Sequence, residues 1–115
     1  MISVKDLTRM AEFYGTVLGL RPVAGTRTEL WAEFGAGTPS LALHAIPPEN
    51  ASQFEITSPP RPREEYPIKL IFSVADLDAE QARFEELGVT MMRRPWGAYD
   101  AVDPEGNIFQ ISQSK

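Results

Sequence analysis

The spacing of apolar residues changes after the first few positions of the chain. Residues 1–4 form a short apolar run typical of a strand. After Asp6, apolar residues recur at i, i+3, i+4 and i+7, which predicts an amphipathic helix. The residues of this stripe are Leu7, Met10, Ala11, Tyr14, Val17 and Leu18. Asp6 is a suitable N-cap because its carboxylate can accept from free backbone N–H groups, and Gly19 is a suitable end.

Three strand-like segments follow this helix, at residues 20–24, 29–34 and 40–46, with turns expected at 25–27 and 35–37. The next segment, residues 47–67, holds six of the ten prolines of the chain. Because proline fixes φ and removes a hydrogen-bond donor, we expect an irregular crossover there. A short helical turn at residues 50–54 is compatible with this irregular segment.

The second half of the chain repeats this order of elements. A strand is predicted at residues 68–74, and Asp76 can cap a helix that Gly88 ends. The buried face of this helix is predicted to carry Leu77, Phe84 and Leu87. Further strands are expected at residues 89–93, 99–102 and 108–112. The run Asp103-Pro104-Glu105-Gly106-Asn107 predicts a hairpin turn between the last two.

The repeat is visible residue by residue. Ser3-Val4-Lys5-Asp6-Leu7 matches Ser73-Val74-Ala75-Asp76-Leu77, and Leu18-Gly19-Leu20 matches Leu87-Gly88-Val89. We therefore predict an α+β fold of two βαβββ modules. Module one spans residues 1–46, the Pro-rich linker 47–67 and module two 68–115. A chain of 115 residues is too short for two independent cores, so the modules form one domain.

Composition narrows the classes of function. Hydrophobic residues make up 43% of the chain and charged residues 23%, which is typical of a folded core. A net charge of -5 argues against binding nucleic acid or an anionic membrane. The absence of cysteine excludes disulfides, thiolate metal sites and cysteine nucleophiles. The sequence shows neither a long apolar segment nor a signal pattern, so we expect a cytoplasmic protein.

Two motifs stand near the ends of the chain. The opening motif is Val4-Lys5-Asp6-Leu7 with Phe13-Tyr14 and Leu18-Gly19-Leu20, and the closing motif is residues 103–110. Together they resemble those of the vicinal oxygen chelate (VOC) superfamily of glyoxalases, bleomycin-resistance proteins and dioxygenases. The likeness covers nearly the whole chain, with the Pro-rich linker as its least typical part. It implies that each module curls a mixed sheet around a cavity and that modules pair, often within a homodimer. The superfamily contains enzymes and non-catalytic binding proteins, so the fold alone does not decide the function.

The resemblance also implies a divalent metal held by His, Gln and Glu from the first strand and a late strand of each module. The first of these positions precedes residue 1, and a start further upstream would restore it. The other three are Lys69, Ala42 and Gln110. Lysine has no lone pair for a metal and alanine has no donor, which leaves Gln110. His44, which shares side-chain parity with Ala42, would add a second ligand. We therefore expect no metal and no other cofactor, with an atypical divalent metal site as the alternative.

Strand alternation indicates which side chains would line a cavity instead. Lys69 groups with Ile71 and Ser73, and Gln110 with Ile108 and Ser112. If these faces meet that of His44, the cavity combines a cation, an imidazole and an amide with apolar walls. This combination suits a small, partly apolar molecule with an acidic or hydrogen-bonding group. The candidate ligand-binding residues are His44, Lys69, Gln110, Trp31 and Tyr99.

Four of these candidates also have a purely structural interpretation. His44 could be a hydrogen-bonded structural residue, and Lys69 a solvated charge that protects a sheet edge. Trp31 and Tyr99 could pack in the core or in a dimer interface. Arg93 and Arg94 could bind an anion, but we expect both arginines to be solvated at a strand end.

Three functions remain open, in this order of preference. The first is metal-free binding of a small molecule by a homodimer, which resembles the bleomycin-resistance branch. The second is an enzyme, either a glyoxalase-like lyase/isomerase or dioxygenase with an atypical metal site, or a metal-free catalyst with His44 as acid–base. The third is an accessory subunit with a vestigial cavity.

Overall fold

The computed structural model describes residues 1–35, 40–53, 55–63 and 68–114 of the chain. The chain divides into two compact units, Met1–Ile56 and Thr57–Lys115, hereafter unit 1 and unit 2. The division falls inside the Pro-rich segment.

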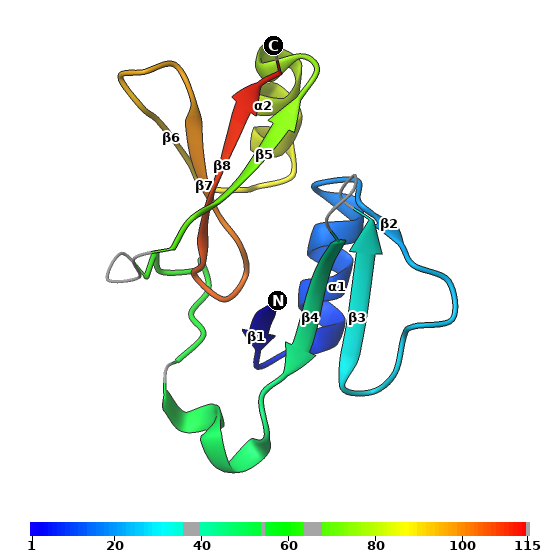
Figure 1. Cartoon of the computed structure of the whole chain (residues 1–115). Coiled ribbons are helices and arrows are strands. Elements are labelled where there is room, and N and C mark those ends of the chain that lie inside the picture. The colour runs from blue at the N-terminus through cyan, green and yellow to red at the C-terminus, as the bar shows by residue number, and fades with distance from the viewer. Residues whose placement is uncertain (36–39, 54, 64–67, 115) are drawn as a thin grey trace. The chain divides into compact units, whose positions relative to one another are not determined.

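The described residues of unit 1 form one α-helix, one 3-10 helix and a mixed four-stranded sheet (Figure 1). Its elements are β1 (Ile2–Val4), α1 (Leu7–Thr16), β2 (Arg21–Pro22), β3 (Trp31–Gly35), β4 (Ser40–Ala45) and the 3-10 helix η1 (Pro48–Gln53). The strand order is β1-β4-β3-β2. β1 runs parallel to β4, and the other neighbours are antiparallel.

Unit 2 repeats this topology. Its elements are β5 (Leu70–Val74), α2 (Leu77–Glu86), β6 (Met91–Arg93), β7 (Tyr99–Val102) and β8 (Ile108–Gln113). The strand order is β5-β8-β7-β6, with β5 parallel to β8. The prediction of an α+β fold built from two βαβββ modules is therefore confirmed.

The two helices begin as the sequence predicts. Oδ1 of Asp6 accepts from the backbone N–H of Arg9 at 3.0 Å, and Oδ1 of Asp76 accepts from that of Ala79 at 3.1 Å. Each aspartate thus satisfies one N–H group that the first helical turn leaves free. Within the described residues, no helix is long and apolar enough to cross a membrane.

Gly88 ends α2 in a left-handed conformation, with a φ of 77°. The N–H of Val89 then donates to the carbonyl oxygen of Phe84 at 3.0 Å, and the N–H of Gly88 donates to that of Glu85 at 3.0 Å. This pair of bonds is a Schellman C-cap, which requires the positive φ that glycine adopts without strain. Because Val89 belongs to the cap, β6 begins at Met91 and not at residue 89 as predicted.

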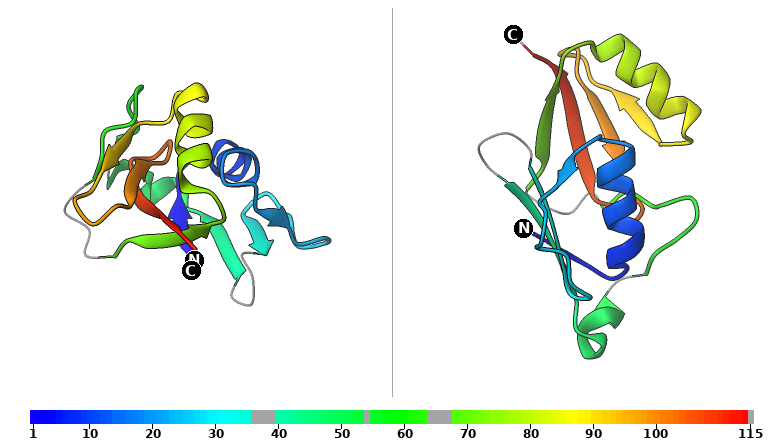
Figure 2. Two further views of the ribbon diagram at one scale, coloured as in Figure 1. Left: turned by 90° about the horizontal axis from the view of Figure 1, so that it is seen from above. Right: turned by 90° about the vertical axis from the view of Figure 1, so that its right-hand side faces the viewer.

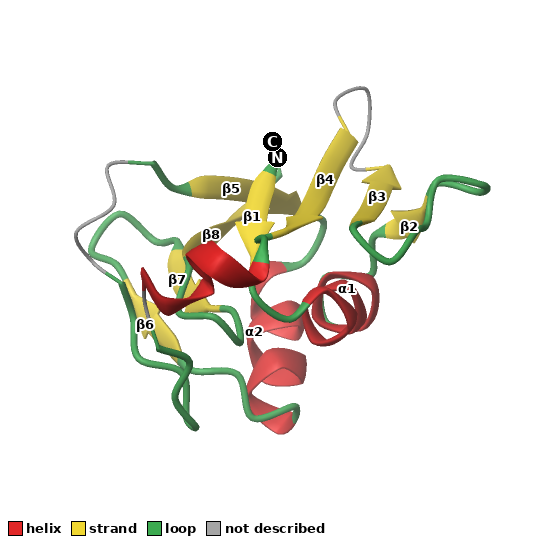
Figure 3. Ribbon diagram, turned by 90° about the horizontal axis from the view of Figure 1, so that it is seen from below, coloured by secondary structure: helices red, strands yellow, loops and turns green. Residues whose placement is uncertain are grey.

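Each sheet packs one face against its own helix (Figures 2 and 3). In unit 1, Met10 and Tyr14 of α1 are fully buried, and the apolar side chains of β3 and β4 that share this core are Ala32, Phe34, Leu41 and Leu43. In unit 2, the ring of Phe84 lies against that of Phe109 on β8, with the centroids 6.4 Å apart. The polar candidates of the sequence lie mainly on the other face of each sheet.

Leu87 corrects the predicted buried face of α2. Leu77 and Phe84 are buried as expected, but Leu87 is 49% exposed. The reason is its position, because Leu87 is the C-cap, where the helix ends and the chain turns at Gly88. The strand predicted at residues 99–102 coincides with β7, and the other predicted strand limits differ from the structure by at most two residues, as at β2, which spans Arg21–Pro22 only. Residues 36, 37 and 54 of the predicted turns lie outside the described residues.

Candidate functional site

The turn between β7 and β8 fixes which residues face each other on these strands. Oδ1 of Asp103 accepts from the backbone N–H groups of Glu105 and Asn107, both at 2.9 Å. The N–H of Gly106 donates to the carbonyl oxygen of Asp103 at 3.0 Å. The predicted hairpin turn is thereby confirmed, and it places Asp100 directly opposite Gln110.

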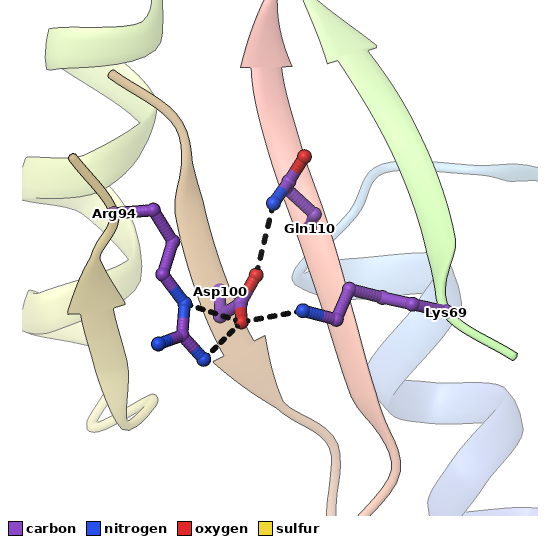
Figure 4. A network of polar contacts seen from close by, with 4 residues as sticks. All are labelled: Lys69, Arg94, Asp100 and Gln110. Carbon is purple, nitrogen blue, oxygen red and sulfur yellow. Dashed lines mark hydrogen bonds and ion pairs between the residues drawn. The ribbon is translucent and has the colours of Figure 1, made fainter. Parts of the chain in front are cut away.

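Asp100 is the centre of a polar network on this face of unit 2 (Figure 4). Its Oδ2 lies 2.7 Å from Nζ of Lys69 and 2.6 Å from Nη2 of Arg94. Nε of Arg94 donates to the same oxygen at 2.8 Å, and Nε2 of Gln110 donates to Oδ1 at 3.1 Å. Both carboxylate oxygens are therefore occupied by donors.

Local structure brings the two cations to Asp100. Lys69 directly precedes β5, the edge strand next to β8. Arg94 follows β6 and begins a tight turn in which the N–H of Gly97 donates to the Arg94 carbonyl oxygen at 3.0 Å. Pro95 suits the second position of this turn because its φ is already fixed near the required value. The cations thus approach one carboxylate from opposite sides.

Burial and charge act against each other on Asp100, whose side chain is 3% exposed. Burial raises the pKa of Asp100, but the hydrogen bonds from Lys69, Arg94 and Gln110 together lower it further, so the net pKa lies below the usual value. Asp100 is therefore ionised at neutral pH. Two cations and one carboxylate leave the network with one net positive charge.

Exposed apolar side chains flank this network. Ile71 is the strand neighbour of Gln110 and is 61% exposed, and Met92 is the strand neighbour of Asp100 and is also exposed. Strand neighbours in register point to the same side of a sheet. The face therefore combines a cationic centre with apolar surface.

The structure brings two of the predicted ligand-binding residues together and separates a third. Lys69 and Gln110 both bond to Asp100, a residue that the sequence analysis did not single out. Tyr99 pairs with Ile111, on the face that packs against α2, and so lies on the opposite side of the sheet. The prediction that Arg94 is solvated is wrong, because its guanidinium is bound to Asp100 and 27% exposed.

The sequence did hold a signal for Asp100. Pairing along a hairpin is fixed by its turn. Counting outward from the turn at residues 103–107 puts residue 102 opposite 108 and residue 100 opposite 110. An acidic side chain directly opposite Gln110 could therefore have been predicted.

In unit 1, His44 and Trp31 lie opposite each other on β4 and β3. Their ring centroids are 6.0 Å apart in an edge-to-face arrangement. Nε1 of Trp31 donates to Oε1 of Glu33 at 3.4 Å, and Glu33 is the strand neighbour of Ala42. These residues share the face that does not pack on α1. That His44 shares a cavity with Lys69 and Gln110 stays a prediction.

The side chains at the expected metal positions do not match the needs of a divalent cation. The Lys69 ammonium offers three donors and no lone pair, and Ala42 offers no ligand atom. Gln110 donates its amide to Oδ1 of Asp100, and Oδ2 of that carboxylate already binds both cations. Among the described residues, no cluster of three His, Asp or Glu side chains could hold a metal ion.

Comparison with known proteins identifies related sequences and folds. The family model of a glyoxalase-like domain matches residues 1–112. No curated protein sequence matches the chain. Lactoylglutathione lyase from Agrobacterium tumefaciens is 26% identical with a TM-score of 0.63, and the match covers 98% of this chain and 89% of that one.

Two further solved structures share the fold at lower identity. A fosfomycin resistance protein from Mesorhizobium loti is 19% identical with a TM-score of 0.67, over 98% of this chain and 86% of that one. An antibiotic-binding protein from a Streptomyces species is 20% identical with a TM-score of 0.62, over 99% of this chain and 93% of that one. A lyase, a resistance protein and an antibiotic-binding protein thus share this architecture.

Proposed function

The chain belongs to the glyoxalase-like domain family, and we propose that it binds a small, partly apolar anion without a metal. The observation that carries this proposal is the network around Asp100, which stands where the family resemblance implies metal ligands. Lys69 and Arg94 bind one carboxylate between them, so one positive charge remains for a ligand.

The geometry suits recognition of an anionic group. The side chains of Lys69 and Arg94 are 36% and 27% exposed, so a ligand can reach them while Asp100 below holds them in place. A donor that is fixed before binding loses little conformational freedom when the ligand arrives. Ile71 and Met92 supply apolar surface for the rest of the molecule.

The same network supports binding without catalysis. With its pKa below the usual value, Asp100 is a weak proton acceptor, and its oxygens are already engaged. The donors Lys69 and Arg94 would repel a divalent cation. An antibiotic-binding protein shares the fold, which is consistent with a chain that sequesters a small molecule.

A titration with 2-naphthoate tests the anion site. Trp96 is exposed in the tight turn that begins at Arg94. We expect saturable shifts of its indole N–H and of the backbone amides of residues 92–94 in a spectrum of the ¹⁵N-labelled chain. The neutral analogue 2-naphthamide should bind about tenfold more weakly or worse, since it lacks the charge. Equal binding of both compounds, or no binding of either, would overturn the proposal.

Two matched variants test whether the positive charge that binds 2-naphthoate belongs to Arg94. Arg94→Met removes one cation of the network, and we expect it to weaken 2-naphthoate binding about tenfold. Arg93→Met removes the neighbouring charge, whose residue pairs with Tyr99 on the other face of the sheet, and should leave binding unchanged. Equal effects of the two variants would show that 2-naphthoate binding responds only to the overall charge of the chain and not to Arg94.

The alternative is a glyoxalase-like lyase/isomerase or dioxygenase with an atypical metal site. Equilibrium dialysis against Zn²⁺, Mn²⁺ and Ni²⁺, followed by metal analysis, separates the two functions. We expect no stoichiometric metal, and metal-dependent turnover of a hemithioacetal or a catechol would establish the enzyme instead.

We also propose that the chain forms a homodimer and acts in the cytoplasm. Light scattering on the purified chain measures the first property, and cell fractionation measures the second. A monomer across micromolar concentrations would refute the dimer.

A further inference from the structure

A pocket of about 460 Å³ lies within unit 1, between α1, β3 and the segment that joins β2 to β3. Its volume is within the range of small-molecule sites, which is roughly 300–1,000 Å³. Ala32 and Phe34 contribute to its wall, and both lie on the face of the sheet that packs against α1. The pocket is therefore on the opposite side of this sheet from His44 and Trp31.

The wall of this pocket is mainly apolar. Ala11 and Gly15 contribute from α1, Phe34 from β3, and Val23 from the joining segment. Binding the hydrocarbon part of a ligand against an apolar wall is favourable, because it removes apolar surface from water. The pocket thus has a surface suited to an aliphatic or aromatic body.

Gly15 keeps this pocket open although packing does not require a glycine there. A Cβ at residue 15 would meet Cε1 of Phe34 at 3.5 Å, which is ordinary van der Waals contact. Glycine is also unfavourable within a helix relative to alanine. A side chain larger than a methyl group at residue 15 would occupy part of the pocket that Gly15 lines.

Arg27, which is exposed, provides a cation at the same pocket. Its Nη1 donates to the carbonyl oxygen of Thr28 and to that of Trp31, the latter at 3.4 Å. These bonds hold the guanidinium against the chain, and its other N–H groups suit a carboxylate. Glu12 of α1 and Glu33 of β3 also contribute to the pocket. Glu12 is exposed and can turn toward water, and the Glu33 carboxylate accepts from Nε1 of Trp31 on the other face of the sheet.

We propose that this pocket binds a small monocarboxylate with an apolar body. The carboxylate binds Arg27, and the body lies over Gly15 against Phe34. This site is within unit 1 and does not rest on the function proposed for the face of unit 2 around Asp100.

A titration of the ¹⁵N-labelled full chain with octanoate tests this site. We expect saturable amide shifts at Gly15, Val23 and Phe34. Octan-1-ol, which has the same apolar chain and no charge, should bind about tenfold more weakly. Saturable shifts confined to residues 69–71 and 92–94 would overturn the pocket and leave the anion site of unit 2 standing. The absence of saturable shifts at millimolar octanoate would also overturn the pocket.

Three variants complete the test. Gly15→Leu fills the pocket and should weaken binding of octanoate and octan-1-ol alike, by about tenfold or more. Arg27→Gln should weaken octanoate about tenfold and leave octan-1-ol unchanged. Arg9→Gln removes the same charge from an exposed position of α1 and should change neither. If Gly15→Leu does not fold, the comparison of Arg27→Gln with Arg9→Gln still decides, and equal effects of these two variants would refute the proposal.

Discussion

The side-chain amide of Gln110 donates to the carboxylate of Asp100 at 3.1 Å across the paired strands β7 and β8. This bond turns the amide nitrogen of Gln110 toward an aspartate that already binds Lys69 and Arg94. The side chain that the family resemblance offers as a metal ligand is thereby part of an ion-paired network. Removal of the charge at its centre should affect stability and its pH dependence.

Asp100→Asn should destabilise the chain at pH 7 by about 1–3 kcal/mol, because Lys69 and Arg94 lose their shared counter-charge. The partial exposure of both cations keeps the loss below that of a fully buried pair. Urea unfolding of the wild type and of Asp100→Asn measures the difference in the free energy of unfolding. The midpoints can be compared directly if the free energy of unfolding depends on urea concentration with the same slope in both proteins. An unchanged midpoint would show that the network adds no net stability.

The stability difference between the wild type and Asp100→Asn should also depend on pH. The pKa of Asp100 is lower in the folded chain than its ordinary value of about 3.9, so its ionised form contributes stability above that pH. This contribution is lost as pH falls through the folded pKa. The difference should therefore be constant near neutrality and shrink below about pH 4. A difference that grows in acid would contradict the assigned direction.

Gly106 should tolerate alanine far less well than Gly97. Both glycines have positive φ, 84° and 92°, which costs an L-residue about 1–2 kcal/mol. A Cβ at residue 106 would also lie 2.3 Å from the carbonyl oxygen of Arg61, whereas one at residue 97 meets nothing within 4 Å. We expect Gly106→Ala to cost at least about 1 kcal/mol more than Gly97→Ala. Similar unfolding midpoints for the two variants would show that the close approach to Arg61 relaxes without cost.

Local rules in the sequence predicted the fold because each acts within a few residues. The caps Asp6 and Asp76 and the stop at Gly88 all depend on hydrogen bonds within one helical turn. The helical periodicity and the internal repeat then predicted which segments before and after each helix are strands. Where the prediction was wrong, as at Leu87, periodicity was extended past the point at which the helix ends.

The candidate site was less accessible to prediction because its contacts are not local. Lys69 lies 31 residues before Asp100 in the sequence, and the two meet only because β5 pairs with β8 beside β7. Arg94 was predicted to be solvated because a charged side chain at the end of a strand usually is. The tight turn that directs Arg94 to Asp100 depends on Pro95 and Gly97 together. The alternation of side chains along a strand predicted which residues share a face of that strand. It did not predict which other strand lies beside it in the sheet.

Phe84→Ala should destabilise unit 2 strongly, by about 3–5 kcal/mol. Phe84 is fully buried, and its ring packs against that of Phe109 at the centre of the contact between α2 and its sheet. Leu87→Ala is the matched control on the same helix, since Leu87 is half exposed, and it should cost less than about 1 kcal/mol. Thermal unfolding measures both variants. Equal losses would indicate that Leu87 is buried in solution, as the helical periodicity predicts.

Gly15→Ala should stabilise the chain by about 0.5–1 kcal/mol, because alanine favours a helix and the added Cβ makes only ordinary contact with Phe34. Gly19→Ala should have the opposite effect. Gly19 has a φ of 65°, so alanine there is strained although nothing lies within 4 Å of its Cβ. Urea unfolding of both variants measures the two changes. Destabilisation by Gly15→Ala would mean that the helix and β3 lie closer together than the structure places them, and the pocket over Gly15 would then be too small for the proposed ligand.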